Sequence, residues 1–184
     1  MPSKRKDFGP PSEQSAVTVR AVLPPAHERL RRASVGDAID GLPAHLTMLY
    51  PFVDPARLGP WVRRRLAEVS ATVPAFEYRL VGAGTWPDAI YVAVDPVDPF
   101  VELQRRLAAA FPGFPIYGTD PGFDFVPHVT VAEGPPIHDP ATLDDPAWSS
   151  LPRPGRAAFI EVIARPTAAP WRTIWRLPLG RMRT

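Results

Sequence analysis

Apolar and polar residues alternate in several short segments of the chain, which is the pattern of half-buried β-strands. In residues 16–23 one side of an extended backbone carries the apolar residues Val17, Val19, Ala21 and Leu23, and a pair of prolines ends the segment. The sequence therefore predicts about seven short strands. The six further segments with this pattern are residues 45–50, 76–81, 90–94, 128–132, 159–164 and 171–177.

Three other segments have apolar residues every three or four positions, the spacing of amphipathic helices. The clearest is residues 99–111, in which Phe100, Leu103 and Leu107 share one side. The other two helices are predicted over residues 26–33 and 55–70, and long turn-rich connections over residues 112–127 and 134–156. The glycine-rich segment 82–87 contains a proline where a phosphate-binding loop would continue into a helix, so it predicts a turn between strands.

The last predicted strand, residues 171–177, has two chemically different sides. Its alternation predicts one side packed in the core and the opposite side either at the edge of a cleft or facing solvent. The first side carries Trp171, Thr173, Trp175 and Leu177, and the second carries Arg172 and Arg176.

The chain has 184 residues, a length that favours one domain with a real core. We expect an α+β fold in residues 16–184, preceded by a flexible N-terminal arm in residues 1–15, which are charged and proline-rich. No apolar run approaches the roughly 18–20 residues of a membrane span, and the N-terminus lacks the apolar core of a signal peptide. The sequence therefore predicts a cytoplasmic protein with no membrane partner.

Composition and charge narrow the chemistry. There is no cysteine, which excludes disulfides, thiolate metal sites and cysteine nucleophiles. The net charge is only +2, which favours a small anionic partner over a long nucleic acid. Residues 153–184 nevertheless contain seven arginines and a single acid, Glu161. This segment is either a solvated basic face or a rim that attracts phosphate.

Two histidines occur in matching settings, 83 residues apart. His45 begins the segment His45-Leu46-Thr47, and His128 begins His128-Val129-Thr130. Each segment opens a predicted strand just after a proline, and each follows an earlier strand and helix, so the chain has the pattern of an internal duplication. A single His-x-Thr occurs by chance, whereas two copies in matching strands favour a shared function.

The spacing of this motif has a chemical meaning. Alternate residues of a strand point to the same side, so each strand presents one imidazole beside one hydroxyl. If the halves pack about a pseudo-twofold axis, the four side chains His45, Thr47, His128 and Thr130 face one cleft. The two imidazoles then serve as general acid and base on opposite sides of a phosphorus atom, and the hydroxyls bind phosphate oxygens. The other two histidines, His27 and His138, are expected away from this cleft.

The segments PAHLTMLYPF and FVPHVTVAEG resemble the paired signatures of the 2H phosphoesterases, the superfamily of bacterial 2′-5′ RNA ligase-like proteins and cyclic phosphodiesterases. The resemblance implies a bilobal, duplicated fold in which two antiparallel sheets flank a central cleft and the helices lie outside. It implies metal-independent chemistry with no cofactor at a nucleotide or RNA phosphodiester, with a 2′,3′-cyclic phosphate as the usual substrate. His45 would protonate the leaving oxygen and His128 would activate water.

Members of this superfamily often stack a base on an aromatic side chain near the cleft, and Tyr50 and Tyr91 are the candidates for substrate binding. Glu133 stands after the second motif, where relatives often carry an aromatic or basic residue. The sequence thus predicts a hydrolytic phosphoesterase acting on a small nucleotide or an RNA end, as a monomer. Two alternatives stay open: a module that binds such ligands without turnover, and 2′-5′ RNA ligation through the same site.

Overall fold

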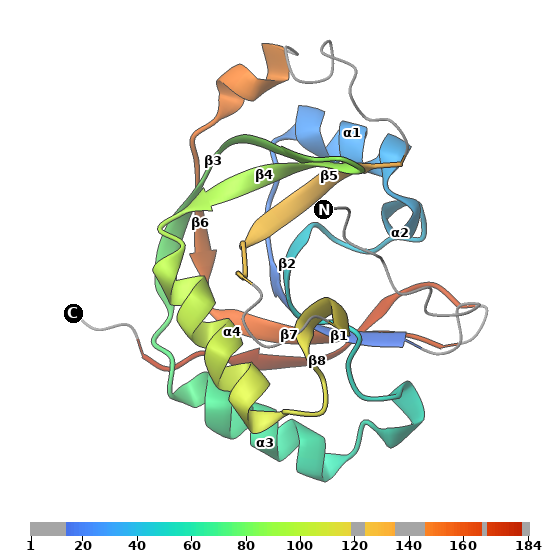
Figure 1. The fold of residues 1–184 in the computed structure, drawn as a ribbon, viewed down its shortest axis with the longest axis vertical. Helices are drawn as coiled ribbons and strands as arrows, with labels where there is room; N and C mark the ends of the chain where they lie inside the picture. The colour runs from blue at the N-terminus through green and yellow to red at the C-terminus, as the bar shows by residue number, and fades with distance from the viewer. Residues whose placement is uncertain (1–13, 119–123, 135–145, 167–168, 182–184) are drawn as a thin grey trace.

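The computed structural model describes residues 14–118, 124–134, 146–166 and 169–181. Eight strands form two separate four-stranded sheets in which every pair of neighbours is antiparallel (Figure 1). The first sheet has the order β2-β1-β7-β8, with bounds His45–Leu49, Gln14–Arg20, Phe159–Arg165 and Arg172–Pro178. The second sheet has the order β5-β4-β3-β6, with bounds His128–Glu133, Ala89–Asp95, Phe76–Trp86 and Arg153–Ala157.

The helices cover the sheets as an α+β fold requires. Helix α1 packs against β5, α3 packs against β8, and α4 packs against α3 and β2. Phe100 of α4 also contacts the rings of Phe76 and Tyr78 in β3, so this helix belongs to the core of both sheets. The helical segments are α1 (Pro25–Ser34), α2 (Gly36–Ile39), η1 (Pro55–Arg57), α3 (Pro60–Ala71), α4 (Asp98–Ala110), η2 (Ile116–Gly118) and η3 (Pro146–Ser150).

One continuous apolar core joins the two sheets. Alternate residues of each strand face it, among them Leu46 and Met48 of β2 and Val129 and Val131 of β5, none of them exposed. The residues between them therefore face away from the core. The edge strands β2 and β5 lie against each other, so the two sheets meet where the two His-x-Thr segments lie (Figure 1). Within the described residues, no helix is long and apolar enough to cross a membrane.

The predicted α+β, two-sheet class is confirmed, and all seven predicted strands are present with shifted ends. Strand β1 begins at Gln14, so Gln14 and Ser15, which were predicted to belong to the flexible arm, pair with β7. The other residues of the predicted arm lie outside the described part. The predicted helix 55–70 is divided by the turn before Pro60 into η1 and α3.

Two elements were predicted wrongly because glycine and proline suggested turns. Strand β3 continues to Trp86 through the segment predicted as a turn, with a bulge between Leu80 and Gly82. Strand β6 lies inside the predicted connection 134–156, and its Pro154 is tolerated because β6 is an edge strand. In both strands a glycine admits a neighbouring ring, since a Cβ at Gly84 or Gly155 would collide with a tyrosine.

The prediction that one side of β8 packs wholly in the core is also wrong. Trp175 pairs with Val162, whereas Thr173 pairs with the next residue, Ile163, so β8 has one extra residue in a bulge between them. The bulge places Thr173 and Trp175 on opposite faces of the sheet. Trp175 and Leu177 pack on the main core, while Thr173 is exposed on the opposite face together with Arg176.

Candidate active site

The two predicted catalytic histidines are held by the same backbone contact. Nδ1 of His45 donates to the carbonyl oxygen of Pro43 at 2.8 Å, and Nδ1 of His128 donates to the carbonyl oxygen of Val126 at 2.7 Å. In each case the acceptor lies two residues before the histidine, in the turn that leads into the strand. Because Nδ1 carries the proton of the neutral ring, its lone pair is on Nε2. Each ring is thus oriented with Nε2 as the atom that can accept or release a proton.

The threonines of the two motifs lie on the same faces as their histidines. In the first sheet Arg20 pairs with His45 and Thr18 with Thr47, and in the second sheet Ala93 pairs with His128 and Tyr91 with Thr130. Thr47 and Thr130 are half-buried, and among the described residues neither hydroxyl makes a hydrogen bond to the protein. The geometry therefore leaves both hydroxyls able to bind a ligand oxygen.

The histidines are close enough to affect each other's charge. The pKa of His45 is lowered from 6.5 to about 4, chiefly by burial and also by the positive charge of Arg31 and by the neighbouring His128. The Pro43 carbonyl and Asp37 act in the opposite direction and raise it. Burial also lowers the pKa of His128, against the carbonyl of Val126. Both imidazoles are therefore neutral at neutral pH in the free protein, and a bound phosphate anion would favour the return of one proton.

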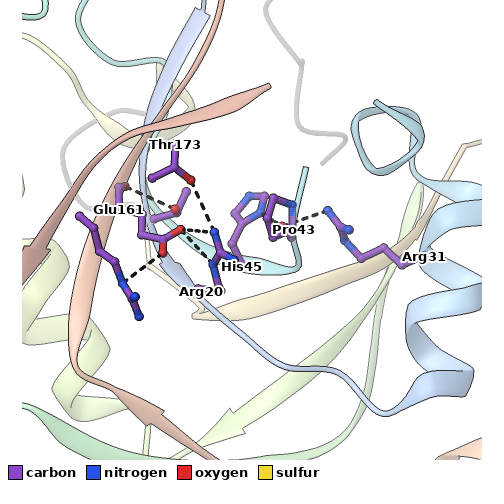
Figure 2. A network of polar contacts seen from close by, with 8 residues as sticks. Arg20, Arg31, Pro43, His45, Glu161 and Thr173 are labelled. Carbon is purple, nitrogen blue, oxygen red and sulfur yellow. Dashed lines mark hydrogen bonds and ion pairs between the residues drawn. The ribbon is translucent and has the colours of Figure 1, made fainter. Parts of the chain in front are cut away.

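Arg31 supports the first histidine from behind. Its side chain projects from α1, is 2% exposed, and donates from Nη2 to the Pro43 carbonyl oxygen at 3.3 Å (Figure 2). The same oxygen accepts the Nδ1 proton of His45, so one carbonyl connects the guanidinium to the imidazole. The sequence analysis missed this residue. Its signal is the four-residue spacing from the buried His27, which places both on the inner side of α1.

Aromatic rings surround the second histidine. Trp86 stacks on Tyr91 with ring centroids 4.4 Å apart and an interplanar angle of 35°. His128 meets Trp86 edge-on at 4.5 Å and Tyr91 at 5.3 Å. Trp86 was missed because its segment was predicted to be a turn. The sequence pattern that could have indicated it is the alternation of Gly82, Gly84 and Trp86. In an extended strand these three residues share one face, where the two glycines leave space beside the aromatic ring.

The other tyrosine candidate has different surroundings. Tyr50 follows β2, its hydroxyl donates to Gln14 Oε1 at 3.1 Å, and its ring meets Tyr117 edge-on at 6.4 Å. It packs against a small cluster that includes Ile163 and Trp171. The structure thus brings Tyr91 against His128 and places Tyr50 against Gln14, Tyr117 and this small cluster.

The first histidine has charged neighbours. Arg20, on the adjacent strand, donates from Nε and Nη2 to the carboxylate of Glu161, whose other oxygen lies 3.6 Å from Nε of Arg176 (Figure 2). Arg20 and Glu161 line a narrow crevice together with His45. Its other lining residues are Thr18, Leu42, Pro43, Ala44 and Ile163.

The third described histidine, His27, is not part of this geometry. His27 lies on the predicted helix, is buried, and meets the ring of Trp148 edge-on at 4.5 Å. His138, which was expected away from the cleft, lies outside the described residues. Within the described residues no three histidine, aspartate or glutamate side chains come together as ligands for a metal ion.

Comparison with known proteins identifies the family. The model of the 2′-5′ RNA ligase superfamily matches residues 19–159, which include both motifs. The chain belongs to this superfamily. Membership confirms the resemblance to the 2H phosphoesterases and gives the coarse class of activity, a phosphoesterase or ligase. A search of the curated proteins finds no match.

Solved structures share the fold at low sequence identity. TT0787 of Thermus thermophilus aligns with a TM-score of 0.60 at 16% identity, covering 92% of this chain and 100% of that one. LigT of Escherichia coli in complex with 3′-AMP aligns with a TM-score of 0.53 at 15% identity, covering 93% and 100%. The NADP+ complex of LigT gives 0.55 at 15% identity, covering 92% and 99%.

Proposed function

We propose that this member of the 2′-5′ RNA ligase superfamily is a metal-independent phosphoesterase that hydrolyses the 2′,3′-cyclic phosphate of a nucleotide or an RNA end. The observation that carries the proposal is the equivalence of the two motifs. Each histidine lies on an edge strand, each donates from Nδ1 to a carbonyl two residues earlier, and the two edge strands contact each other. Family membership and the complexes of LigT with 3′-AMP and NADP+ support a nucleotide ligand.

In the proposed reaction a water molecule attacks the phosphorus of the cyclic phosphate. Nε2 of His128 takes a proton from this water as the new P–O bond forms. The bond to one ribose oxygen breaks on the opposite side, and that oxygen receives the proton held by Nε2 of His45. The hydroxyls of Thr47 and Thr130 donate to the other phosphate oxygens, on which charge increases in the transition state. The product is a nucleoside monophosphate, and one proton has passed through each imidazole.

The low pKa of His45 suits its role as the acid. Once protonated, a ring with a pKa of about 4 gives up its proton readily to a leaving oxygen. The stacked Trp86 and Tyr91 beside His128 offer a surface for the nucleobase, and Tyr50 remains the second aromatic candidate.

The test is turnover of nucleoside 2′,3′-cyclic phosphates, followed by ³¹P NMR with the wild-type chain and with a His45→Ala/His128→Ala double variant. We expect a monophosphate product from the wild type and none above background from the double variant. Tight binding without turnover would instead support a binding module. Joining of RNA ends without hydrolysis would support a ligase.

A further inference from the structure

A row of charged side chains extends from His45 across the face of the first sheet that points away from the main apolar core. Arg20 pairs with His45 in neighbouring strands, Glu161 pairs with Thr18, and Arg176 pairs with Glu161. Directly paired residues of antiparallel strands point to the same side. The row therefore lies on the same face as the catalytic imidazole, beginning one strand away from it.

The carboxylate at the centre of the row is buried, while the two cations reach solvent. Glu161 is 4% exposed, and its Oε2 accepts from Nε and Nη2 of Arg20 at 3.1 and 3.0 Å. The side chains of Arg20 and Arg176 are 46% and 59% exposed. The guanidinium of Arg176 lies 4.0 Å over the ring of Phe159, which restrains it further. Each guanidinium is thus held on one side and remains partly exposed to solvent.

The charges in this row do not cancel. Neutralising one buried carboxylate requires one cation, and here two guanidiniums share it, so the group carries a net positive charge. The hydroxyl of Thr173 adds a polar group 3.5 Å from Nη2 of Arg20. A planar guanidinium whose orientation is already fixed loses little entropy when it binds an oxyanion, and guanidiniums match phosphate geometry. These are the properties of a phosphate-binding surface.

From this geometry we infer that Arg20 and Arg176, oriented by Glu161, form a subsite for a second phosphoryl group of the substrate. The inference rests on the proposed function, in which the histidines and threonines bind the reacting phosphate. The second group is either the 5′-phosphate of a nucleoside 2′,3′-cyclic phosphate or the preceding phosphodiester of an RNA that ends in a cyclic phosphate. Arg20 pairs directly with His45 in the neighbouring strand, so the two subsites adjoin each other.

The first experiment compares kcat/KM for three substrates: adenosine 2′,3′-cyclic phosphate, its 5′-phosphorylated form, and a dinucleotide that ends in the cyclic phosphate. A second phosphoryl group bound by two guanidiniums should raise kcat/KM about 10- to 100-fold, the usual effect of charge-assisted hydrogen bonds. Preference for the 5′-phosphorylated mononucleotide identifies the first source, and preference for the dinucleotide identifies the second. Equal values for all three substrates would overturn the inference but leave the proposed function intact.

Variants then test whether the row is responsible. Arg176→Gln removes an exposed cation, and Arg20→Gln/Glu161→Gln replaces the buried ion pair with two neutral amides that can still bond to each other. Both should reduce the preference severalfold. The control is Arg105→Gln, because Arg105 shares the carboxylate of Glu102 with Arg106 on α4 in the same Arg–Glu–Arg combination. A preference that is unchanged in both row variants would contradict the assignment.

A binding measurement separates this inference from catalysis. Calorimetry gives the affinities of the wild type and Arg176→Gln for 3′-AMP and for adenosine 3′,5′-bisphosphate. We expect the bisphosphate to bind more tightly to the wild type, and most of the difference to disappear in the variant. If the cyclic substrates are not turned over, the proposed hydrolysis fails while this comparison still decides the subsite. Equal affinities for the two ligands would refute the subsite.

Discussion

The two histidine motifs share their backbone geometry and differ in what surrounds them. Each ring donates from Nδ1 to the carbonyl two residues before it. Around His45 the neighbours are charged: Arg31 behind the ring, and Arg20 with Glu161 on the adjacent strands. Around His128 the neighbours are the rings of Trp86 and Tyr91. The duplicated halves thus keep the same histidine geometry and differ in the residues beside it.

Under the proposed function, this difference assigns proton transfer and ligand recognition to separate parts of each strand pair. The carbonyl contact is made within the motif itself, so any strand that begins with the same turn can reproduce it. The charged and aromatic surfaces come from neighbouring strands, which have diverged between the halves. An anionic group is expected on the His45 side and a flat apolar group on the His128 side. The predictions below test the shared part first and the divergent parts afterwards.

The largest expected effect comes from removing either histidine. His45→Ala and His128→Ala should each lower kcat about 10²- to 10⁴-fold, the usual contribution of a positioned acid or base. The double variant should be little worse than the worse single variant, because the two rings act as a unit. Steady-state kinetics on a cyclic phosphate measures all three, and thermal unfolding checks that each variant is folded. Multiplicative losses in the double variant would show that the rings act independently.

The next largest effect is expected for the hydroxyls. Thr47→Ala and Thr130→Ala each remove one donor to the phosphate while leaving both imidazoles in place. We expect losses of about 10- to 100-fold in kcat, of similar size in the two halves. Thr47→Ser and Thr130→Ser keep the hydroxyl and serve as matched controls. A large loss in one half and none in the other would show that only one threonine contacts the reacting phosphate.

The aromatic surface should affect binding more than chemistry. Trp86→Ala should raise KM for a nucleotide substrate about tenfold, within the range of base–aromatic stacking, with little change in kcat. Gly84→Ala should act in the same direction, because its new Cβ would displace the ring of Tyr91. The control is Trp61→Ala, a tryptophan that is 61% exposed on α3. A fall in kcat at constant KM would contradict a stacking role.

The contrast between the halves also shows what could be predicted from the sequence. The edge strands and their four side chains were predictable because His-x-Thr is contiguous and strand alternation fixes its direction. Gln14 at the start of β1, strand β6 and the extension of β3 were not, since the apolar pattern is weak there and proline or glycine suggested turns. Trp86 was missed because it lies in this extension of β3.

The charged neighbours of His45 could not be predicted from the sequence for a different reason. Arg20 and Glu161 are 141 residues apart in the chain and meet only because β1 pairs with β7. The arginine-rich segment 153–184 was seen, but only the bulge in β8 determines that Arg176 and Thr173 share the face of Glu161. Contacts across strands that are distant in the sequence require the topology, which the apolar pattern alone does not determine.

The smallest expected effect is a shift in the pH dependence of the His45 half. The profile of kcat/KM should be bell-shaped, since one ring must be protonated and the other neutral. Activity should fall with rising pH as the pair loses its last proton, at a pH below 6.5 because the pKa values of both rings are lowered. It should fall again toward pH 4, as the second ring becomes protonated.

Replacing Arg31 should move only the acid limb of this profile. Arg31→Met removes a positive charge that lowers the pKa of His45, so this pKa should rise toward 6.5 and the acid limb should move to higher pH. Burial and the neighbouring His128 still lower the pKa in this variant, while Asp37 and the Pro43 carbonyl still raise it, so the shift is partial. Arg31→Lys keeps the charge and should restore the wild-type limb, and Arg32→Met tests a solvent-facing arginine of the same helix. An acid limb that does not move in Arg31→Met would show that this guanidinium stabilises α1 without acting on His45.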